Sequence, residues 1–152
     1  MADFTPDPLQ KSVSENLKVI IDEIEQQQPT PPTNARVDWV GTFSSSNKQL
    51  VEGTEIRAEI GTRFGIRYTL TGRLTGREIS QTVVYRFPAT GIIFGDGRRT
   101  STEIRGICYT GRTCIAGWTF SDSNELVPGS WSIEIWEGNR KLIIRTFQVT
   151  TK

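Results

Sequence analysis

The spacing of hydrophobic and polar positions changes near Ala35. Before this point apolar side chains recur every three or four residues, which is the period of an amphipathic helix. After it they alternate with polar side chains, as in β-strands that bury one face. The pattern predicts a helix over residues 1–28, a proline-rich linker over 29–34 and a β-domain over 35–152.

The predicted N-terminal helix has clear start and stop signals. Asp7 can cap it, Pro8 suits its first position, and Pro29 opposes its continuation. Its apolar side chains fall within an arc of roughly 120° on a helical wheel. These candidate partner-binding residues are Leu9, Val13, Leu17, Ile20, Ile21 and Ile24. We expect this stripe to pack on its own domain, pair with a second copy or enter a groove of another protein.

The β-domain is predicted to hold about eight short strands, rich in β-branched and aromatic residues. Their runs include Val37–Gly41, Ile56–Ile60, Phe64–Leu70, Val83–Phe87, Ile104–Tyr109, Cys114–Phe120, Trp131–Ile135 and Leu142–Val149. Glycine-containing turns separate them, and no helical run lies between them. This organisation predicts a mainly β fold, an antiparallel sandwich. A closed barrel would leave a similar pattern.

Alternation also predicts which side chains are buried. The expected core includes Trp39, Tyr68 and Trp131, and a second row formed by Ile56, Ala58 and Ile60. The last run changes phase between Leu142 and Val149. We expect a β-bulge near Arg145 and Thr146 to restore its phase.

The C-terminal third carries a family resemblance. It contains Gly117-Trp118, then the run from Val127 to Ile135 around Pro128-Gly129-Ser130-Trp131, and finally Phe147-Gln148-Val149. These residues resemble the closing hairpin of a family of uncharacterised bacterial immunoglobulin-like domains, common in cyanobacteria and of unknown function. The resemblance covers roughly residues 35–152, outside the predicted helix. It implies an immunoglobulin-like sandwich and supplies no functional residue.

Charge is unevenly distributed between the predicted parts. Residues 1–32 carry a net charge of −4, and residues 33–152 carry +5, with 13 arginines among 16 basic residues. Arg57, Arg67 and Arg86 have the parity of outward-facing side chains, so they are the candidate anion-binding residues. Their ligand would be RNA, an acidic protein or a glycan. The small basic excess and the buried parity of the aromatics argue against a dedicated nucleic-acid reader.

The chain lacks the residues of the commonest catalytic and metal sites. It has no histidine and two cysteines, so histidine-based catalysis and zinc ligation are not expected. Cys108 and Cys114 would face each other if Thr110–Arg112 formed a hairpin loop. With no apolar stretch of about 18 residues and no signal-like N-terminus, we expect a cytoplasmic protein. Two free thiols are then expected.

These observations favour a non-catalytic protein-interaction or assembly module. We expect no cofactor, no metal ion and no membrane partner. The expected partner is another protein or a second copy, bound through the N-terminal helix. The alternative is an anion-binding module that uses the arginine-rich face.

Overall fold

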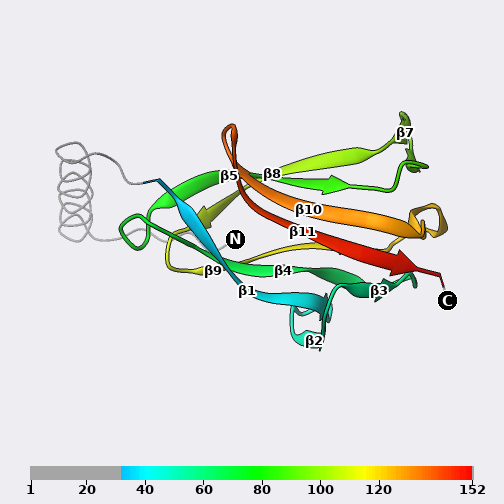
Figure 1. Cartoon of the computed structure of the whole chain (residues 1–152), viewed down its shortest axis with the longest axis horizontal. Coiled ribbons are helices and arrows are strands. Elements are labelled where there is room, and N and C mark those ends of the chain that lie inside the picture. The colour runs from blue at the N-terminus through cyan, green and yellow to red at the C-terminus, as the bar shows by residue number, and fades with distance from the viewer. Residues whose placement is uncertain (1–31, 152) are drawn as a thin grey trace, which may run out of the picture. The chain divides into compact units, whose positions relative to one another are not determined.

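The computed structural model describes residues 32–151 (Figure 1). The described part of the chain is built from β-strands and one short 3-10 helix. They are β1 (Asn34–Phe43), β2 (Gln49–Glu52), β3 (Glu55–Arg57), β4 (Arg63–Thr71), β5 (Glu78–Arg86), β6 (Ile92–Phe94), β7 (Gly97–Arg99), β8 (Ser101–Tyr109), β9 (Thr113–Thr119), η1 (Ser123–Glu125), β10 (Gly129–Glu137) and β11 (Arg140–Thr150). The predicted N-terminal helix, with its stripe from Leu9 to Ile24, lies outside the described residues.

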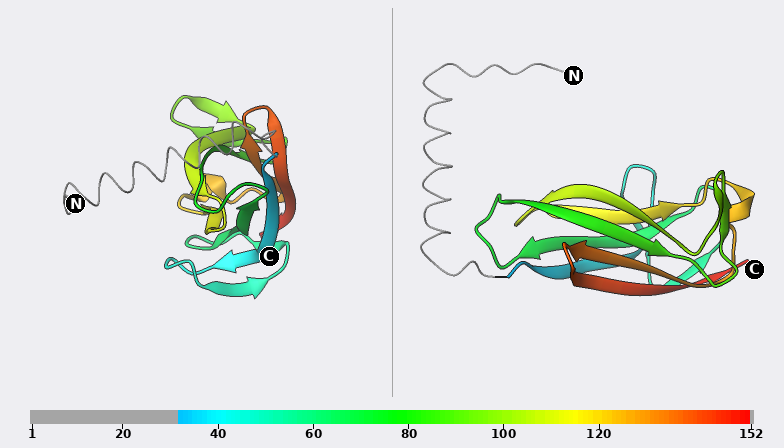
Figure 2. Two further views of the ribbon diagram at one scale, coloured as in Figure 1. Left: turned by 90° about the vertical axis from the view of Figure 1, so that its left-hand side faces the viewer. Right: turned by 90° about the horizontal axis from the view of Figure 1, so that it is seen from above.

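The strands form two main sheets. One has the order β2-β1-β4-β9, the other has the order β3-β11-β10-β5-β8, and β6 pairs with β7 in a separate hairpin. All neighbours are antiparallel except β3 and β11, which run parallel. Near the meeting of the two sheets, β1 and β11 lie side by side (Figure 2). The prediction of a mainly β, antiparallel fold is confirmed. The eight predicted runs correspond to β1, β3, β4, β5, β8, β9, β10 and β11.

The core lies between the two sheets and is centred on Trp131 of β10. Phe64 of β4 and Phe87 contact the Trp131 ring edge-on, with centroid distances of 5.8 and 5.0 Å. Trp118 and Phe120 approach the same ring at 5.7 and 5.5 Å. Such edge-to-face pairs add about 0.5–1.5 kcal/mol each to the effect of burial. The predicted burial of Tyr68 and Trp131 is confirmed.

The prediction for Trp39 is wrong, because a β-bulge interrupts β1. Val37 pairs with Tyr68 and Trp39 with Arg67, so Asp38 is the extra residue. A bulge of one residue moves the following side chains to the opposite face of the sheet. Trp39 therefore packs edge-on against Phe43, 5.0 Å between ring centroids, on the outer face. Both rings lie outside the main core cluster.

Two further strands also differ from the predicted alternation. Strand β3 ends at Arg57, and Ile60 lies in a turn closed by the bond from Thr62 N to Glu59 O, so Ile60 is exposed. In β11 the bulge falls at Leu142, because Ile135 pairs with Ile143 whereas Trp136 pairs with Lys141. The predicted bulge near Arg145 is therefore wrong. The position at Leu142 places Ile143, rather than Ile144, in the core.

A disulfide joins Cys108 of β8 to Cys114 of β9. These strands are consecutive in the chain, but β8 belongs to the five-stranded sheet and β9 to the four-stranded one. The two cysteines therefore face each other without the hairpin considered from the sequence, and the expectation of two free thiols is wrong. The bridge instead links the edges of the two sheets, where the chain crosses from one to the other.

Candidate interaction surfaces

The sandwich has two open sides, each bordered by one edge strand from each sheet. Strands β2 and β3 border one side, and β8 and β9 border the other. A sheet edge presents unpaired backbone N–H and C=O groups that another chain can pair with. The disulfide lies on the β8–β9 side. A covalent bond therefore joins the two sheets on the β8–β9 side.

A groove with a volume of about 500 Å³ lies on the β2–β3 side. We call it the β2–β3 groove. Its lining comes from both sheets and the turn between β3 and β4: Thr42, Phe43, Ser44, Ser45, Leu50, Val51, Glu55, Arg57, Ile60, Gly61, Thr62 and Arg63. Leu50, Val51 and Ile60 are 61%, 67% and 58% exposed. Scattered exposed aliphatic residues are common on protein surfaces, but a cluster around one concavity is typical of an interaction site.

Local contacts hold the β1–β2 connection over the outer face of the four-stranded sheet. Asn47 adopts a left-handed backbone conformation with φ of 64°, which asparagine tolerates better than most residues. Its side-chain oxygen accepts a hydrogen bond from Arg63 Nε, and its carbonyl oxygen accepts one from Arg67 Nη2, each at 3.1 Å. These bonds fix the position of β2 and with it one wall of the groove.

The base and rim of the β2–β3 groove have different chemistry. Phe43, which is buried against Trp39, contributes an apolar surface to the lining. On the rim, Arg57 Nε lies 3.0 Å from Glu59 Oε1 in an exposed ion pair. Exposed pairs of this kind contribute little to stability and are easily replaced by contacts to a ligand. The groove can therefore accept an apolar segment with charged groups at its border.

A second groove runs along the outer face of the five-stranded sheet. Two adjoining concavities of about 610 and 370 Å³ share Thr82, Arg105 and Gly138. Glu134 lies beside them with only 3% of its side chain exposed. Arg86 Nε and Trp136 Nε1 each donate to its carboxylate at 2.8 Å, and Lys141 Nζ lies 3.9 Å away.

Burial opposes the ionisation of Glu134, but the hydrogen bonds from Arg86 and Trp136 and the charges of Arg86 and Lys141 outweigh it. They hold the pKa of the Glu134 carboxyl below its usual value. A general acid at neutral pH needs the opposite shift. This carboxylate is therefore an ionised, hydrogen-bonded part of the sheet surface.

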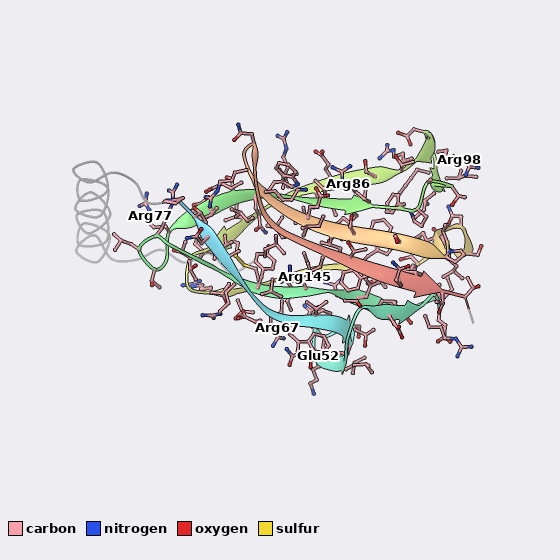
Figure 3. The ribbon with its side chains drawn as sticks, in the orientation of Figure 1. Glu52, Arg67, Arg77, Arg86, Arg98 and Arg145 are labelled. Carbon is pink, nitrogen blue, oxygen red and sulfur yellow. A yellow bond between two sulfur atoms is a disulfide. The ribbon has the colours of Figure 1, made fainter. Side chains whose placement is uncertain are left out.

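The predicted anion-binding residues do not form one face. Arg57 and Arg86 belong to the five-stranded sheet, whereas Arg67 belongs to the four-stranded sheet. Figure 3 shows Arg67 and Arg86 on different sheets. Each also has a partner within the domain: Glu59 for Arg57, the Asn47 carbonyl for Arg67, and Glu134 for Arg86. The predicted outward parity is correct for Arg57 and Arg86, which are exposed.

Sequence reasoning missed the cluster of Leu50, Val51 and Ile60. Leu50 and Val51 form an adjacent apolar pair between polar residues, too short to show a strand period. Ile60 extended an apparent alternation and was predicted to be buried. An apolar residue just before the Gly61-Thr62 turn was the available signal, because the strand ends before such a turn. The predicted stripe from Leu9 to Ile24 stays a prediction outside the described residues.

Within residues 32–151, no group of three or more cysteine, aspartate and glutamate side chains could hold a metal ion. The same part of the chain contains no helix of the length and hydrophobicity needed to cross a membrane.

Comparison with solved structures supports an immunoglobulin-like fold. An immunoglobulin-like protein from Pseudomonas aeruginosa has a TM-score of 0.67 and 26% sequence identity, covering 81% of this chain and 100% of that one. A β-glucosidase from Listeria innocua has a TM-score of 0.47 and 8% identity, covering 78% of this chain and 16% of that one. A DNA glycosylase from Pseudomonas fluorescens has a TM-score of 0.45 and 10% identity, covering 77% and 30%.

No curated protein matches the sequence. A family model, described as a domain of unknown function (DUF3859), matches residues 12–149. The match begins well before the sandwich and includes most of the predicted helix, so the expected boundary of the resemblance at residue 35 is too narrow. The resemblance to a bacterial immunoglobulin-like family of unknown function is confirmed. The chain belongs to the DUF3859 family.

Proposed function

We propose that this domain is a non-catalytic protein-interaction module whose β2–β3 groove binds an extended apolar segment of a partner protein. One observation carries the proposal: Leu50, Val51 and Ile60, each more than half exposed, surround a single groove. Covering such side chains with a partner removes apolar surface from water, which is the main driving force of protein association.

The surroundings of the groove favour an extended segment over a helix. Strands β2 and β3 are the edges of their sheets, and both contribute lining residues. An added strand gains affinity from backbone hydrogen bonds at such an edge and specificity from alternate side chains that enter pockets. The ion pair of Arg57 and Glu59 at the rim would select the charges that flank the apolar residues.

The predicted N-terminal helix is a second element of the proposed function. The family match includes residues 12–31 and therefore most of the apolar stripe. We propose that this stripe also contacts another protein or a second copy. The β2–β3 groove and the stripe would then provide two separate binding elements in one chain, and binding at two elements raises the overall affinity.

Selection from a displayed library of random peptides tests the groove, with the full chain as bait. We expect enriched peptides to carry alternating apolar residues and to lose binding to Leu50→Asp/Ile60→Asp. Ile144→Asp is the matched control, because Ile144 is an exposed aliphatic residue on β11, outside the groove lining. All three replaced side chains are exposed, so the melting temperatures should stay close to that of the unmodified chain.

Two results would contradict the proposal. One is the absence of enrichment above background. The other is the enrichment of peptides that bind the Leu50→Asp/Ile60→Asp variant as well as the unmodified chain. Acidic peptides that depend on Arg86 and dissociate in salt would favour the rival proposal of an anion-binding module.

A further inference from the structure

Strand β8 is a long free edge on the side of the sandwich away from the β2–β3 groove. It ends the five-stranded sheet, pairing with β5 alone, and its label lies in the upper part of Figure 1. Every residue from Glu103 to Ile107 is exposed. Nine residues is ample length for pairing with another strand.

The register with β5 determines which backbone groups of β8 are free. Phe87 N donates to Thr100 O, and Thr110 N donates to Arg77 O, so even-numbered residues of this segment bond towards β5. Hydrogen-bonded and non-hydrogen-bonded pairs alternate along an antiparallel ladder. The N–H and C=O groups of Glu103, Arg105 and Ile107 therefore point away from β5, towards the open edge.

The side chains on this edge carry opposite charges two residues apart. Glu103 and Arg105 share one face of β8, and Ile104, which is 56% exposed, lies on the other. The negative charge of Glu103 helps to raise the pKa of Arg86 on β5, and both Glu103 and Arg105 line the concavity beside that residue. The edge thus presents one negative charge, one aliphatic side chain and one positive charge in consecutive exposed positions.

We propose that two copies of this chain pair edge to edge through β8, antiparallel about a two-fold axis at Ile104. In this register Glu103 lies opposite Arg105 of the second copy, and Arg105 lies opposite Glu103 of the second copy. The two Ile104 side chains meet at a non-hydrogen-bonded position, where side chains come closest. Opposite charges directly across a strand pair stabilise it.

The charges select this register over its neighbours. The nearest registers that keep the backbone hydrogen bonds are shifted by two residues. One of them places Arg105 opposite Arg105 of the second copy, and the other places Glu103 opposite Glu103. Like charges at directly opposed positions destabilise a strand pair. The proposed register therefore has two favourable charge pairs where each neighbour has a central repulsion. Two-fold pairing covers the β8 edge of each copy, so assembly through β8 closes as a dimer and does not extend into a fibre.

This inference goes beyond the proposed function and uses a different side of the sandwich. It specifies a partner, a second copy, and a register for an edge whose charges the proposed function leaves without a role. The β2–β3 groove is left open in the dimer, because β2 and β8 are edges of different sheets.

Charge exchange on the full chain tests the pairing, with sedimentation equilibrium as the measurement. Glu103→Arg places arginine opposite Arg105, and Arg105→Glu places glutamate opposite Glu103. We expect each single variant to raise the dimer dissociation constant by about tenfold or more, since two pairs per dimer become repulsive. The double variant Glu103→Arg/Arg105→Glu should restore the unmodified value. An equimolar mixture of the two single variants should form a heterodimer.

Arg145→Glu is the matched control, because Arg145 is an exposed arginine on β11, which is separated from β8 by β10 and β5. It should dimerise as the unmodified chain does. Amide hydrogen exchange gives a second measurement: exchange at Glu103 and Arg105 should slow as the concentration of the chain rises.

Three results would overturn the inference. The unmodified chain could stay monomeric up to its solubility limit, or both single variants could dimerise normally, or the double variant could fail to recover. Peptide binding at the β2–β3 groove, measured on the same variants, should be unchanged. Loss of dimerisation with intact peptide binding, or the reverse, therefore shows which of the two proposals fails.

Discussion

At the scale of single residues, Tyr68 and Gln81 connect the two sheets through the core. Tyr68 of β4 donates its hydroxyl to Gln81 Oε1 of β5 at 2.7 Å. Tyr68→Phe removes the donor and leaves a buried amide oxygen without its partner. We expect a loss of about 1–3 kcal/mol in the free energy of unfolding, measured by urea denaturation at pH 7. An unchanged unfolding midpoint would contradict this role of the bond.

The same residue makes the domain sensitive to alkali. Burial raises the pKa of Tyr68 to about 12. The usual tyrosine pKa is about 10, so the associated stability is fully present below about pH 10 and is lost as the pH rises towards 12. Over this pH range the free energy of unfolding of Tyr68→Phe should fall less steeply than that of the unmodified chain. Burial also raises the pKa of Tyr85, so some of the alkaline loss should remain.

Glu134 gives the opposite pH dependence. Its pKa is lowered in the folded state, so its contribution is fully present above the usual value of about 4.5 and is lost as the pH falls through the folded value. Glu134→Gln weakens the contacts with Arg86 and Lys141, and should cost about 1–3 kcal/mol at pH 7. The difference in stability between Glu134→Gln and the unmodified chain should shrink as the pH is lowered, in thermal unfolding of the two proteins measured side by side. A difference that is constant with pH would contradict the lowered pKa.

Alternation predicted the burial of Tyr68 but not that of Glu134. Tyr68 lies in a regular stretch of β4 whose inward row is wholly apolar. Glu134 has outward parity, and its burial depends on Arg86, Trp136 and Lys141 meeting over it from three strands. Periodicity within one strand carries no information about such cross-strand cover.

At the scale of elements, Gly41 sets how closely β1 and β2 approach. A Cβ atom at this position would overlap the Val51 carbonyl oxygen and lie 2.7 Å from Trp39 Cη2. Gly41→Ala should push β2 away from β1, destabilise the domain by about 1–3 kcal/mol and weaken peptide binding in the β2–β3 groove. Gly95→Ala is the control, because a Cβ there meets nothing within 4 Å. Equal stability of the two variants would show that β2 adjusts freely.

The Cys108–Cys114 bridge should stabilise the corner where the chain changes sheets. The cysteines are six residues apart, and closing so short a loop contributes about 2 kcal/mol in the chain-entropy model. Cys108→Ala/Cys114→Ala should lose about that much, and the unmodified chain in strong reductant should match it. Mass spectrometry after alkylation without reductant should find no free thiol. Because disulfides persist in oxidising compartments, the same assay on protein from its native host also tests the cytoplasmic expectation.

Bulges explain why element positions were predicted better than element faces. The eight predicted runs all became strands, because alternation within a few residues is a local signal. The extra residues at Asp38 and Leu142 reverse the faces that follow them, and they depend on pairing with strands distant in sequence. This is why Trp39 was placed in the core.

At the scale of the whole molecule, residues 33–152 form one compact unit with its own core. Thr33 anchors the start of this unit: its hydroxyl donates to Glu137 Oε2 at 3.0 Å, and Arg140 donates to its carbonyl oxygen. A chain that begins at Pro32 keeps both bonds. We therefore expect it to fold, with the same melting temperature as the full chain if the predicted helix serves an outside partner.

The truncated chain also separates the contributions of its surfaces to assembly. If β8 pairs two copies, the shortened protein should dimerise with the dissociation constant of the full chain, because every residue of that edge is retained. If the stripe from Leu9 to Ile24 joins the copies instead, dimerisation should disappear while the melting temperature stays constant. A fall in melting temperature on truncation would contradict an outside role for the stripe, since it would mean that residues 1–31 stabilise the sandwich itself.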